Sequence, residues 1–362
     1  MSQPERLVIK VGTGVLTQAN QMLDYNVIHQ IVSQVGELRR MKHQVVLVSS
    51  GAAGASHGLG PFHKEKNRLH RLQMMTSVGQ PRLMALYQDF FREHQITVAQ
   101  ALLTRADFGY RERYLSIRTV LEGLLEMNIL PIINENDVVA GEALTFGDND
   151  YLSAAVASTI DAHRLFLCTT AGGFYQGGDP LRSKDTTLLS EVKGITPAMW
   201  ADCQPTLSMG GRGGMFSKLK AAEMATSFGI HVYVAPGKET RVAPRIMQGE
   251  SLGTHFVPST RKKVGSYRQW LRFGAITNGS ITIDAGAEKA LHNNKSLLPA
   301  GIVATEGSFR AGEVVVIRNE GNTQVGMGVA EIGSTELQEM LEGTREFGRS
   351  HEAVHKDKLI LV

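Results

Sequence analysis

The chain has 362 residues, of which 38 are glycine and 2 are cysteine, and its 38 basic and 35 acidic side chains give a formal net charge of +3. At about 150 residues per domain, this length predicts two or three domains. Cys168 and Cys203 are too few for a disulfide scaffold or a multi-cysteine metal site, and the balanced charge indicates no anionic polymer as partner. The opening MSQPERLVIK lacks the apolar run of a signal peptide, and no stretch reaches the roughly 20 apolar residues of a membrane span. We therefore expect a cytoplasmic protein without membrane contact.

The first part of the chain alternates apolar strands, glycine turns and helices. A strand over 7–11 precedes the turn GTG, a helix pattern covers 27–38, and a strand over 45–48 ends in SSG. Further predicted helices cover 66–94, 110–127, 150–160 and 215–228, and further predicted strands cover 129–133, 165–168 and 231–234. This order is typical of an α/β fold with a parallel sheet, which we place in a domain over residues 1–260.

The pattern changes near residue 260. A polar stretch over 261–272, which includes Arg261, predicts a linker. Short strand-like runs separated by glycines, at 279–284, 301–303 and 312–317, predict a small β-rich domain over 273–350, with a helix at 334–341. Residues 351–362 are predicted to be a C-terminal tail. The tail matches the zinc pattern H-E-x-x-H, but no third ligand follows, so a solvated tail is the favoured interpretation.

Glycine-rich turns follow several of the predicted strands. In open parallel sheets, ligands bind outside the carboxyl ends of the strands. Glycine lets backbone N–H groups approach an anion, and helix N-termini add partial positive charge. The turns at 12–14, 51–54, 147–150 and 210–214 therefore predict a site for an extended ligand that carries phosphate groups.

Two lysines and several acidic residues lie beside these turns. Lys10 interrupts the first apolar strand, where a lysine buried without a partner would be costly, and Lys218 lies in the first turn of a helix. We expect Lys10 to face the ligand; a side chain that reaches solvent at the sheet edge is the structural alternative. Asp137, Asp148 and Asp150 form a polar cluster that predicts a binding site, although helix capping explains one of them.

Taken together, these segments resemble the glutamate 5-kinase family, the branch of the amino acid kinase superfamily that carries a C-terminal PUA domain. The matching strings are VIKVGTGVLT, VSSGAAGA, LLTRADF, PIINENDVV, FGDND and SLLPAGI, and the resemblance extends over nearly the whole chain. The resemblance implies an α/β, three-layer amino-acid-kinase-like sandwich with a mainly parallel central sheet, followed by a small β-rich PUA-like domain. It also implies ATP-dependent phosphorylation of the γ-carboxylate of L-glutamate to L-glutamyl 5-phosphate, the first step of proline biosynthesis.

The resemblance also assigns roles to residues. Lys10 and Lys218 would bind phosphate groups, and Asp150 would hold these two lysines in place. The residues expected to bind glutamate are Ser50, Gly51, Asp137, Asp148 and Asn149. The residues expected to bind ATP are the two lysines with Gly12, Thr169, Thr170, Arg212, Gly213, Gly214, Met215, Phe216 and Ser217. ATP and Mg²⁺ are the expected cofactors, and no metal-ligating side chain is assigned.

The expected partners follow from the same resemblance. They are L-glutamate and ATP as substrates, proline as feedback inhibitor, a homo-oligomer (dimer or tetramer) and a downstream glutamyl phosphate reductase. The chemistry itself needs no general base, because a glutamate γ-carboxyl group with a pKa of about 4.3 is already ionised at neutral pH. Positioning and charge stabilisation are then the main requirements.

The chain departs from the usual family pattern on the nucleotide side. Thr170 stands where an aspartate is usual, Gly14 where a serine is common and Arg212 where a threonine is common, and the stretch 173–182 is longer. Two alternative functions stay open at this point. One is a kinase of this fold with another small carboxylate substrate, and the other is an RNA-binding protein that acts through the PUA-like domain. Residues 261–362 hold 13 basic and 12 acidic side chains, which is not the basic face that RNA binding requires, so RNA is not an expected partner.

Overall fold

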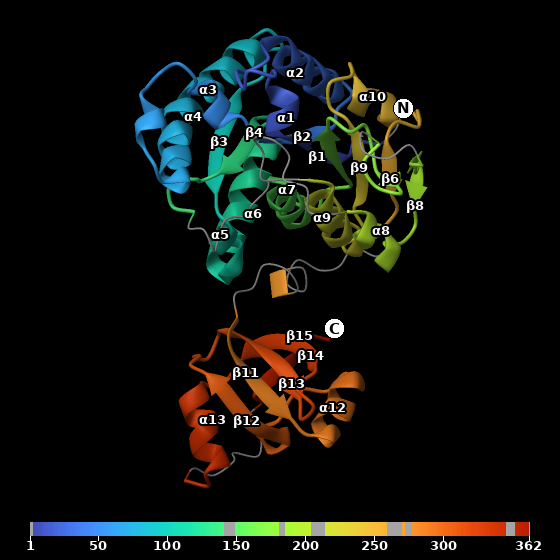
Figure 1. The fold of residues 1–362 in the computed structure, drawn as a ribbon. Coiled ribbons are helices and arrows are strands. Elements are labelled where there is room, and N and C mark those ends of the chain that lie inside the picture. Colours follow the sequence, from blue (N-terminus) through green and yellow to red (C-terminus); the bar gives the residue numbers. More distant parts are fainter. Residues whose placement is uncertain are drawn as a thin grey trace. The chain divides into compact units, whose positions relative to one another are not determined.

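The computed structural model describes residues 3–140, 149–180, 185–203, 214–258, 270–271, 277–344 and 352–361. The chain divides into two compact units. One consists of Met1–Asp107 and Leu115–Lys263, and the other of Phe108–Tyr114 and Val264–Val362. Each unit has its own β-sheet (Figure 1). The sequence-based domain limits, with the linker at 261–272, stay a prediction, because most of that linker lies outside the described residues.

The sheet of the larger unit contains eight strands within the described part of the chain, in the order β3-β4-β2-β1-β5-β9-β10-β8. Neighbouring strands are parallel, except that β10 runs antiparallel to β9. The strands are β1 Arg6–Val11, β2 Gln44–Ser49, β3 Val98–Leu103, β4 Leu130–Glu135, β5 Arg164–Thr169, β8 Glu191–Val192, β9 His231–Pro236 and β10 Thr254–Phe256. A separate two-stranded ribbon pairs β6 Tyr175–Gln176 with β7 Thr187–Leu188.

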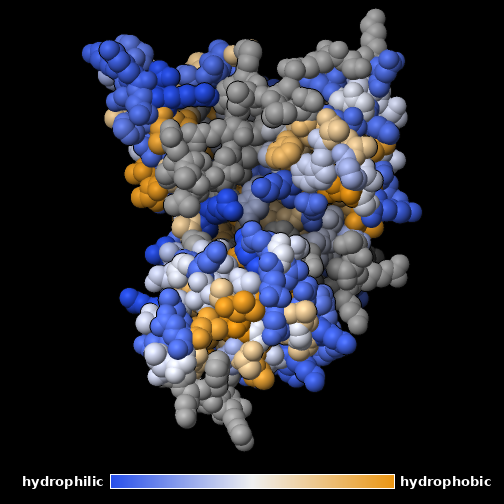
Figure 2. Space-filling model, turned by 60° about the horizontal axis from the view of Figure 1, so that its bottom comes forward, coloured by the Kyte–Doolittle hydropathy of each residue, from blue (hydrophilic) through white to orange (hydrophobic). Residues whose placement is uncertain are grey.

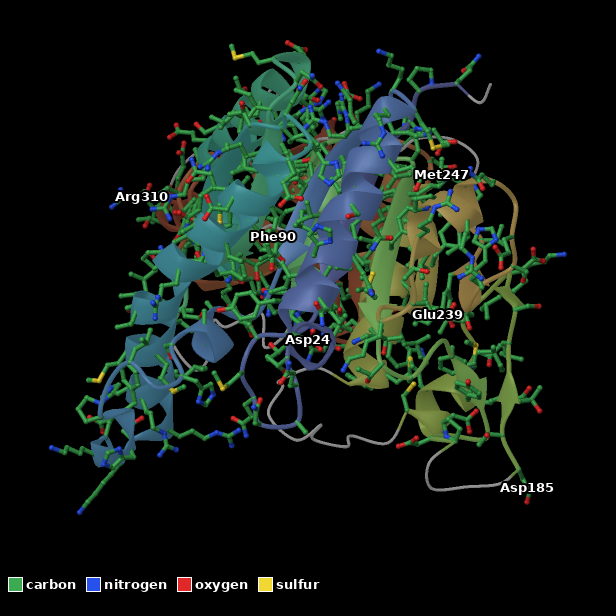
Figure 3. All side chains as sticks on the ribbon, turned by 90° about the horizontal axis from the view of Figure 1, so that it is seen from above. Asp24, Phe90, Asp185, Glu239, Met247 and Arg310 are labelled. Carbon is green, nitrogen blue, oxygen red and sulfur yellow. The ribbon has the colours of Figure 1, made fainter. Side chains whose placement is uncertain are left out.

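Helices cover both faces of this sheet, which confirms the predicted three-layer sandwich. Figure 1 shows α2 and α4 on one side and α6, α7 and α9 on the other. The helices are α1 Thr13–Leu16, α2 Tyr25–Arg40, α3 Ala52–Ala55, η1 Phe62–Lys64, α4 Arg68–Arg92, α5 Arg105–Gly109, α6 Arg111–Glu126, α7 Asn149–Thr159, α8 Pro197–Asp202, α9 Met215–Ser227 and α10 Val242–Met247. Helices α2 and α4 lie side by side (Figure 3). The His29 ring of α2 meets the Phe90 ring of α4 edge-on, with centroids 5.4 Å apart.

The alternation of side chains along β1 decides which of them reach each face. Leu7, Ile9 and Val11 belong to the core that packs against α2 and α4. Lys10 therefore faces the opposite side of the sheet, where α7 packs against β1. In the strand register, Val11 pairs with Ser49 of β2, so the loops after β1 and β2 start at the same edge.

The smaller unit has a sheet in the order β12-β11-β13-β14-β15, as expected for a β-rich domain. Its elements are β11 Thr277–Ile283, α12 Ala285–His292, η3 Pro299–Gly301, β12 Ile302–Gly307, β13 Val314–Asn319, β14 Gln324–Ala330, α13 Ser334–Leu341 and β15 Val354–Leu361. The predicted tail is wrong for Val354–Leu361, because this segment pairs antiparallel with β14. Val354 and Leu359 join the core, while the polar middle of this edge strand stays exposed.

Among the coloured residues on the face that Figure 2 shows, hydrophilic residues predominate and hydrophobic residues form small patches. Across the part of the chain that the structure describes, no helix combines the length and the apolar character needed to cross a membrane.

Helix α4 passes very close to α3 at Gly79. A Cβ atom on Gly79 would lie 1.7 Å from the carbonyl oxygen of Ala52, far inside van der Waals contact, so a glycine is required here. Ala52 directly follows Gly51, which has a φ of 98°, in the left-handed region that favours glycine. The close approach of the two helices therefore sets the position of the turn after β2.

We expect Gly79→Ala to lower the free energy of unfolding of the larger unit by about 1–3 kcal/mol, because the added methyl group must displace backbone. Gly123→Ala in α6 is the matched control, since a Cβ there would meet nothing within 4 Å. That control should be neutral or stabilising by up to about 1 kcal/mol. Urea unfolding followed by circular dichroism measures both variants, and equal midpoints would contradict the packing argument.

A pair of histidines joins β9 to the neighbouring strand β10. His255 lies opposite Tyr233, and the two rings stack with centroids 4.4 Å apart. Nε2 of His255 lies 2.9 Å from Nδ1 of His231, so one hydrogen bond links the two rings. Burial, followed by the charge of His231, lowers the pKa of His255 to about 4. Arg164 acts in the same direction and Glu191 acts against it.

Acid should therefore destabilise this edge of the sheet. The folded state keeps His255 neutral down to a pH of about 4, whereas an unfolded histidine takes up its proton near a pH of about 6.5. The stability contributed by neutral His255 is complete above the unfolded pKa and is lost as the pH falls through this window. Melting temperatures between pH 7.5 and 4.5 should fall less for His255→Gln than for the parent protein or for the exposed-site control His63→Gln. Parallel profiles of His255→Gln and the parent would refute this assignment.

Candidate active site

Lys10, Lys218 and Asp150 meet in one buried cluster. Nζ of Lys10 lies 2.5 Å from Oδ1 of Asp150, and Nζ of Lys218 lies 2.9 Å from Oδ2 of the same carboxylate. The three residues are 2%, 8% and 0% exposed, respectively. Two ammonium groups and one carboxylate sum to a formal charge of +1. The cluster is therefore suited to an anionic ligand such as a phosphate group.

The position of each member follows from its element. Lys10 faces the side of the sheet where α7 packs, as the alternation along β1 requires. Asp150 lies in the first turn of α7, and Lys218 lies in the first turn of α9. Helices α7 and α9 pack against each other, so their first turns bring both side chains to β1.

Two further residues expected to bind ATP complete the cluster. The Ser217 hydroxyl contacts Oδ2 of Asp150 and the carbonyl oxygen of Gly214, both at 2.9 Å. A Cβ atom on Gly12 would lie 3.3 Å from Nζ of Lys10, so the glycine leaves room for the ammonium group. Gly214 is the N-cap residue of α9. Ser217 thus contacts the carboxylate of the cluster, and Gly12 makes space for one of its ammonium groups.

A second polar network surrounds Asn149. Its Nδ2 group donates to the Ser49 carbonyl at 3.2 Å, to the Ser50 hydroxyl at 2.9 Å and to Oδ1 of Asn134 at 2.9 Å. Oδ1 of Asn149 is buried and accepts no hydrogen bond from the described residues. A buried acceptor left without a donor costs about 1–3 kcal/mol, so this oxygen is a candidate contact for a ligand N–H group.

The other residues expected to bind glutamate lie on the adjoining loops. Gly51 is buried at the start of α3, directly after Ser50. Asp137 is half-buried in the turn after β4. Nε2 of Gln73 on α4 donates to the carbonyl of Val138 in this turn at 3.2 Å. Asp148, the fifth of these residues, lies outside the described residues, as do Arg212 and Gly213 on the nucleotide side.

On the predicted nucleotide side, Thr169 ends β5 and is buried, and its hydroxyl accepts from the backbone N–H of Ala171 at 3.3 Å. Thr170 is exposed, and its Cγ2 would lie 3.8 Å from a Cβ on Gly14. Two of the departures from the family pattern are therefore neighbours in space.

The first turn of α9 also carries an aromatic contact. Phe216 is 47% exposed and meets Trp200 of α8 edge-on, with ring centroids 5.2 Å apart. Met215, the first residue of α9, is half-buried. This contact ties α8 to the start of the helix that carries Lys218.

Two ionisable groups beside the site, Cys168 and Tyr87, are not suited to act as bases. Burial raises the pKa of Cys168, the residue before Thr169, to about 12. Burial also raises the pKa of Tyr87 to about 12, although its hydrogen bond with Ser49 opposes the shift. Both groups stay protonated at neutral pH. Within the described ranges, no group of three or more His, Cys, Asp and Glu side chains could hold a metal ion.

Sequence reasoning missed two residues that support this site, Gln80 and Tyr87. Both lie on the buried face of α4, and Oε1 of Gln80 accepts from Nδ2 of Asn134 at 2.8 Å. Their signal in the sequence is a polar group on the apolar stripe of an amphipathic helix. A satisfied core residue gives the same signal, so the pattern alone does not identify them.

Comparison with known proteins finds relatives along the whole chain. The amino acid kinase family matches residues 5–236, and the PUA domain matches residues 279–346. A glutamate 5-kinase of Moorella thermoacetica is 39% identical over 370 residues, which cover 100% of this chain and 97% of that protein. A glutamate 5-kinase of Herpetosiphon aurantiacus is 38% identical, over 98% of both chains.

The fold is also found among solved structures. The carbamate kinase from Giardia lamblia bound to AMP-PNP has a TM-score of 0.50 and 18% sequence identity, and the match covers 71% of this chain and 99% of that chain. At this identity, the likeness concerns the fold alone. The full-length similarity to the curated relatives is more specific, and it shows that the chain belongs to the amino acid kinase family and, within it, to the glutamate 5-kinases.

Proposed function

We propose that this chain transfers the γ-phosphoryl group of ATP to the γ-carboxylate of L-glutamate at the cluster of Lys10, Lys218 and Asp150. The reaction is that of the glutamate 5-kinase family to which the chain belongs. The observation that supports the site assignment best is the buried pair of ammonium groups on one fully buried carboxylate. The residue roles below are parts of the same proposal.

In this proposal the two lysines stabilise the phosphoryl group during transfer. Such a reaction depends on positioning and on compensation of the charge on the phosphoryl oxygens. Asp150 holds both Nζ atoms through separate oxygens, so the cations are fixed before the substrate arrives. Preorganised charges of this kind need little rearrangement in the transition state. The N-terminus of α9 adds partial positive charge next to Lys218.

The glutamate carboxylate needs no base, so the polar network around Asn149 only has to bind and orient the substrate. We call it the substrate network. We assign the buried Oδ1 of Asn149 as an acceptor for the α-ammonium group of glutamate. Ser50 contacts Nδ2 of the same side chain, Gly51 follows Ser50, Asp137 lies in the turn after β4, and Asp148 directly precedes Asn149 in the chain. This arrangement separates substrate recognition from the lysine cluster.

Mg²⁺ is proposed to enter together with ATP. Such sites usually hold Mg²⁺ through substrate phosphates and one or two carboxylates, with water molecules as further ligands. The metal ion would neutralise part of the phosphate charge. The nucleotide itself would lie along Gly12, Thr169 and the start of α9, and Arg212 and Gly213, which lie outside the described residues, are proposed to bind it as well.

The remaining parts of the proposal rest on family membership. They are inhibition by proline, a homo-oligomer (dimer or tetramer), a downstream glutamyl phosphate reductase and a cytoplasmic location. The exposed apolar side chains of Met74 and Val78 on α4, with Val138 and Val139 after β4, support an oligomer contact. The two buried free cysteines agree with a reducing compartment. Light scattering tests the oligomer directly.

The parent protein with ATP, Mg²⁺ and L-glutamate should form an acyl phosphate that hydroxylamine traps as γ-glutamyl hydroxamate. Proline should lower the rate. L-aspartate and glutarate in place of glutamate separate this function from a kinase of another small carboxylate. No hydroxamate above a blank without ATP, or faster reaction with another acid, would overturn the proposed function.

Lys10→Met and Lys218→Met should each lower kcat by about 100-fold to 1,000-fold, because each removes a preorganised charge at the transferred group. Methionine keeps most of the side-chain volume. Lys220→Met is the control, since Lys220 lies on the same helix as Lys218 and is exposed. Single-turnover and steady-state rates measure the effect. Kinetics like those of the control in either cluster variant would remove that lysine from the proposed role.

Asp137→Ala should mainly raise the KM for glutamate, by about tenfold or more, because a charged contact with the substrate is lost. The KM for ATP and the kcat should change by less than about threefold, since Asp137 lies apart from the lysine cluster in this proposal. Initial rates over a matrix of both substrate concentrations separate these constants. An unchanged KM for glutamate would remove Asp137 from the substrate site.

A further inference from the structure

Gln80 is a polar residue in the packed interface between α4 and the sheet. It is 8% exposed, whereas its neighbours on the same helical face, Leu83 and Tyr87, belong to the hydrophobic core. Its Oε1 accepts from Nδ2 of Asn134, at the end of β4, at 2.8 Å. A buried amide that serves packing alone gives up stability relative to an apolar side chain of the same shape. The contact with Asn134 therefore indicates a role beyond packing.

Backbone groups fix the orientation of the amides that follow. The Glu135 N–H can only donate, so the Asn134 atom that it contacts at 2.9 Å must be the oxygen Oδ1. That oxygen also accepts from Asn149, and the Ser49 carbonyl accepts from the same Asn149 atom, which must therefore be Nδ2. Oδ1 of Asn149 is thereby left on the opposite side as the buried acceptor.

Gln80 is the last member of this chain of hydrogen-bonded amides, on the side away from Asn149. With Oδ1 of Asn134 engaged by Glu135 and Asn149, the Nδ2 group of Asn134 needs an acceptor, and Gln80 supplies it. An apolar residue at position 80 would leave this buried donor unsatisfied. To satisfy this donor the Asn134 side chain would have to shift, and its hydrogen bond with Asn149 would weaken, although the Glu135 N–H still fixes which atom of Asn134 is Oδ1.

We propose that Gln80 is a positioning residue for glutamate binding, which acts through Asn134 to aim Oδ1 of Asn149 at the α-ammonium group of the substrate. The inference rests on the proposed function, because it assigns Asn149 to glutamate. Among the described residues, Gln80 makes no hydrogen bond or ion pair with the lysine cluster, and its partner Asn134 connects it to Glu135 and Asn149 of the substrate network. Its removal should therefore affect binding of the ammonium group and not phosphoryl transfer.

The same helix reaches the substrate network by a second route. The Tyr87 hydroxyl lies 2.8 Å from Oγ of Ser49, and the Ser49 hydroxyl donates to the Ser50 carbonyl at 2.9 Å. Helix α4 thus contacts the segment after β2 and, through Gln80, the end of β4. This second route keeps α4 in place when Gln80 alone is changed, so the effect of a substitution at position 80 can be local.

The test compares Gln80→Met with Gln80→Glu and with Gln88→Met, a control at an exposed position of the same helix. Methionine keeps the length of the side chain and removes the acceptor, whereas glutamate keeps an acceptor oxygen. For Gln80→Met we expect a KM for glutamate raised about tenfold, because one buried hydrogen bond is lost. The kcat and the KM for ATP should stay within about twofold of the parent values. Gln80→Glu should restore the KM to within about threefold of the parent value, because a carboxyl group buried at this position is protonated and its carbonyl oxygen still accepts from Asn134.

A second measurement separates positioning from a general structural role. Glutarate lacks the α-ammonium group, so its Ki as a competitor of glutamate should be the same for Gln80→Met and the parent. The inference would be overturned if Gln80→Met raised the Ki of glutarate as much as the KM for glutamate. An unchanged KM for glutamate in Gln80→Met, or a KM in Gln80→Glu as high as in Gln80→Met, would overturn it as well. Gln80→Leu replaces Gln80→Met if the latter does not fold, and failure of both to fold would make the role one of stability and refute the proposal. An inactive parent protein would instead refute the proposed function.

Discussion

The structure depends on one electrostatic arrangement, a fully buried Asp150 carboxylate held between the ammonium groups of Lys10 and Lys218. None of these charges would be stable at this depth alone, because an unpaired buried charge is strongly disfavoured. Each charge is therefore stable only when β1, α7 and α9 bring the three side chains together. The arrangement links β1, α7 and α9, and it leaves positive charge at the edge where the substrates meet in the proposed mechanism.

The substrate network has the opposite character. It is built from neutral amides and hydroxyls, and backbone groups of Glu135 and Ser49 set its polarity. Amide groups can present either a donor or an acceptor, so the surrounding donors and acceptors determine which group faces the substrate. Helix α4 contributes to this choice through Gln80, while its close approach at Gly79 locates the turn of Gly51. The lysine cluster and the substrate network are thus separate, so one sheet edge can hold charges for phosphoryl transfer and directional hydrogen bonds for substrate binding.

Much of this organisation could be predicted from the sequence. Lys10 in an apolar strand and Asp150 and Lys218 at helix starts are local signals, and parallel strands bring such positions to one edge. The network of Gln80 could not be predicted, because residues 54 positions apart in the chain meet only after α4 packs on β4. The edge strands β3 and β15 were missed because neither shows a clear apolar alternation: β3 has no fully buried residue, and β15 has a run of consecutive exposed polar residues at its middle. The roles carried over from the family remain proposals for the individual residues.

The most direct test of this account is the kcat of Asp150→Asn, with a melting curve to establish that the variant is folded. Asparagine keeps the shape of the side chain but removes the charge that holds both lysines. The account predicts a kcat at least about a hundredfold below that of the parent protein in a folded variant, since the cations are no longer preorganised. A folded Asp150→Asn variant with a kcat within about threefold of the parent would contradict the central claim.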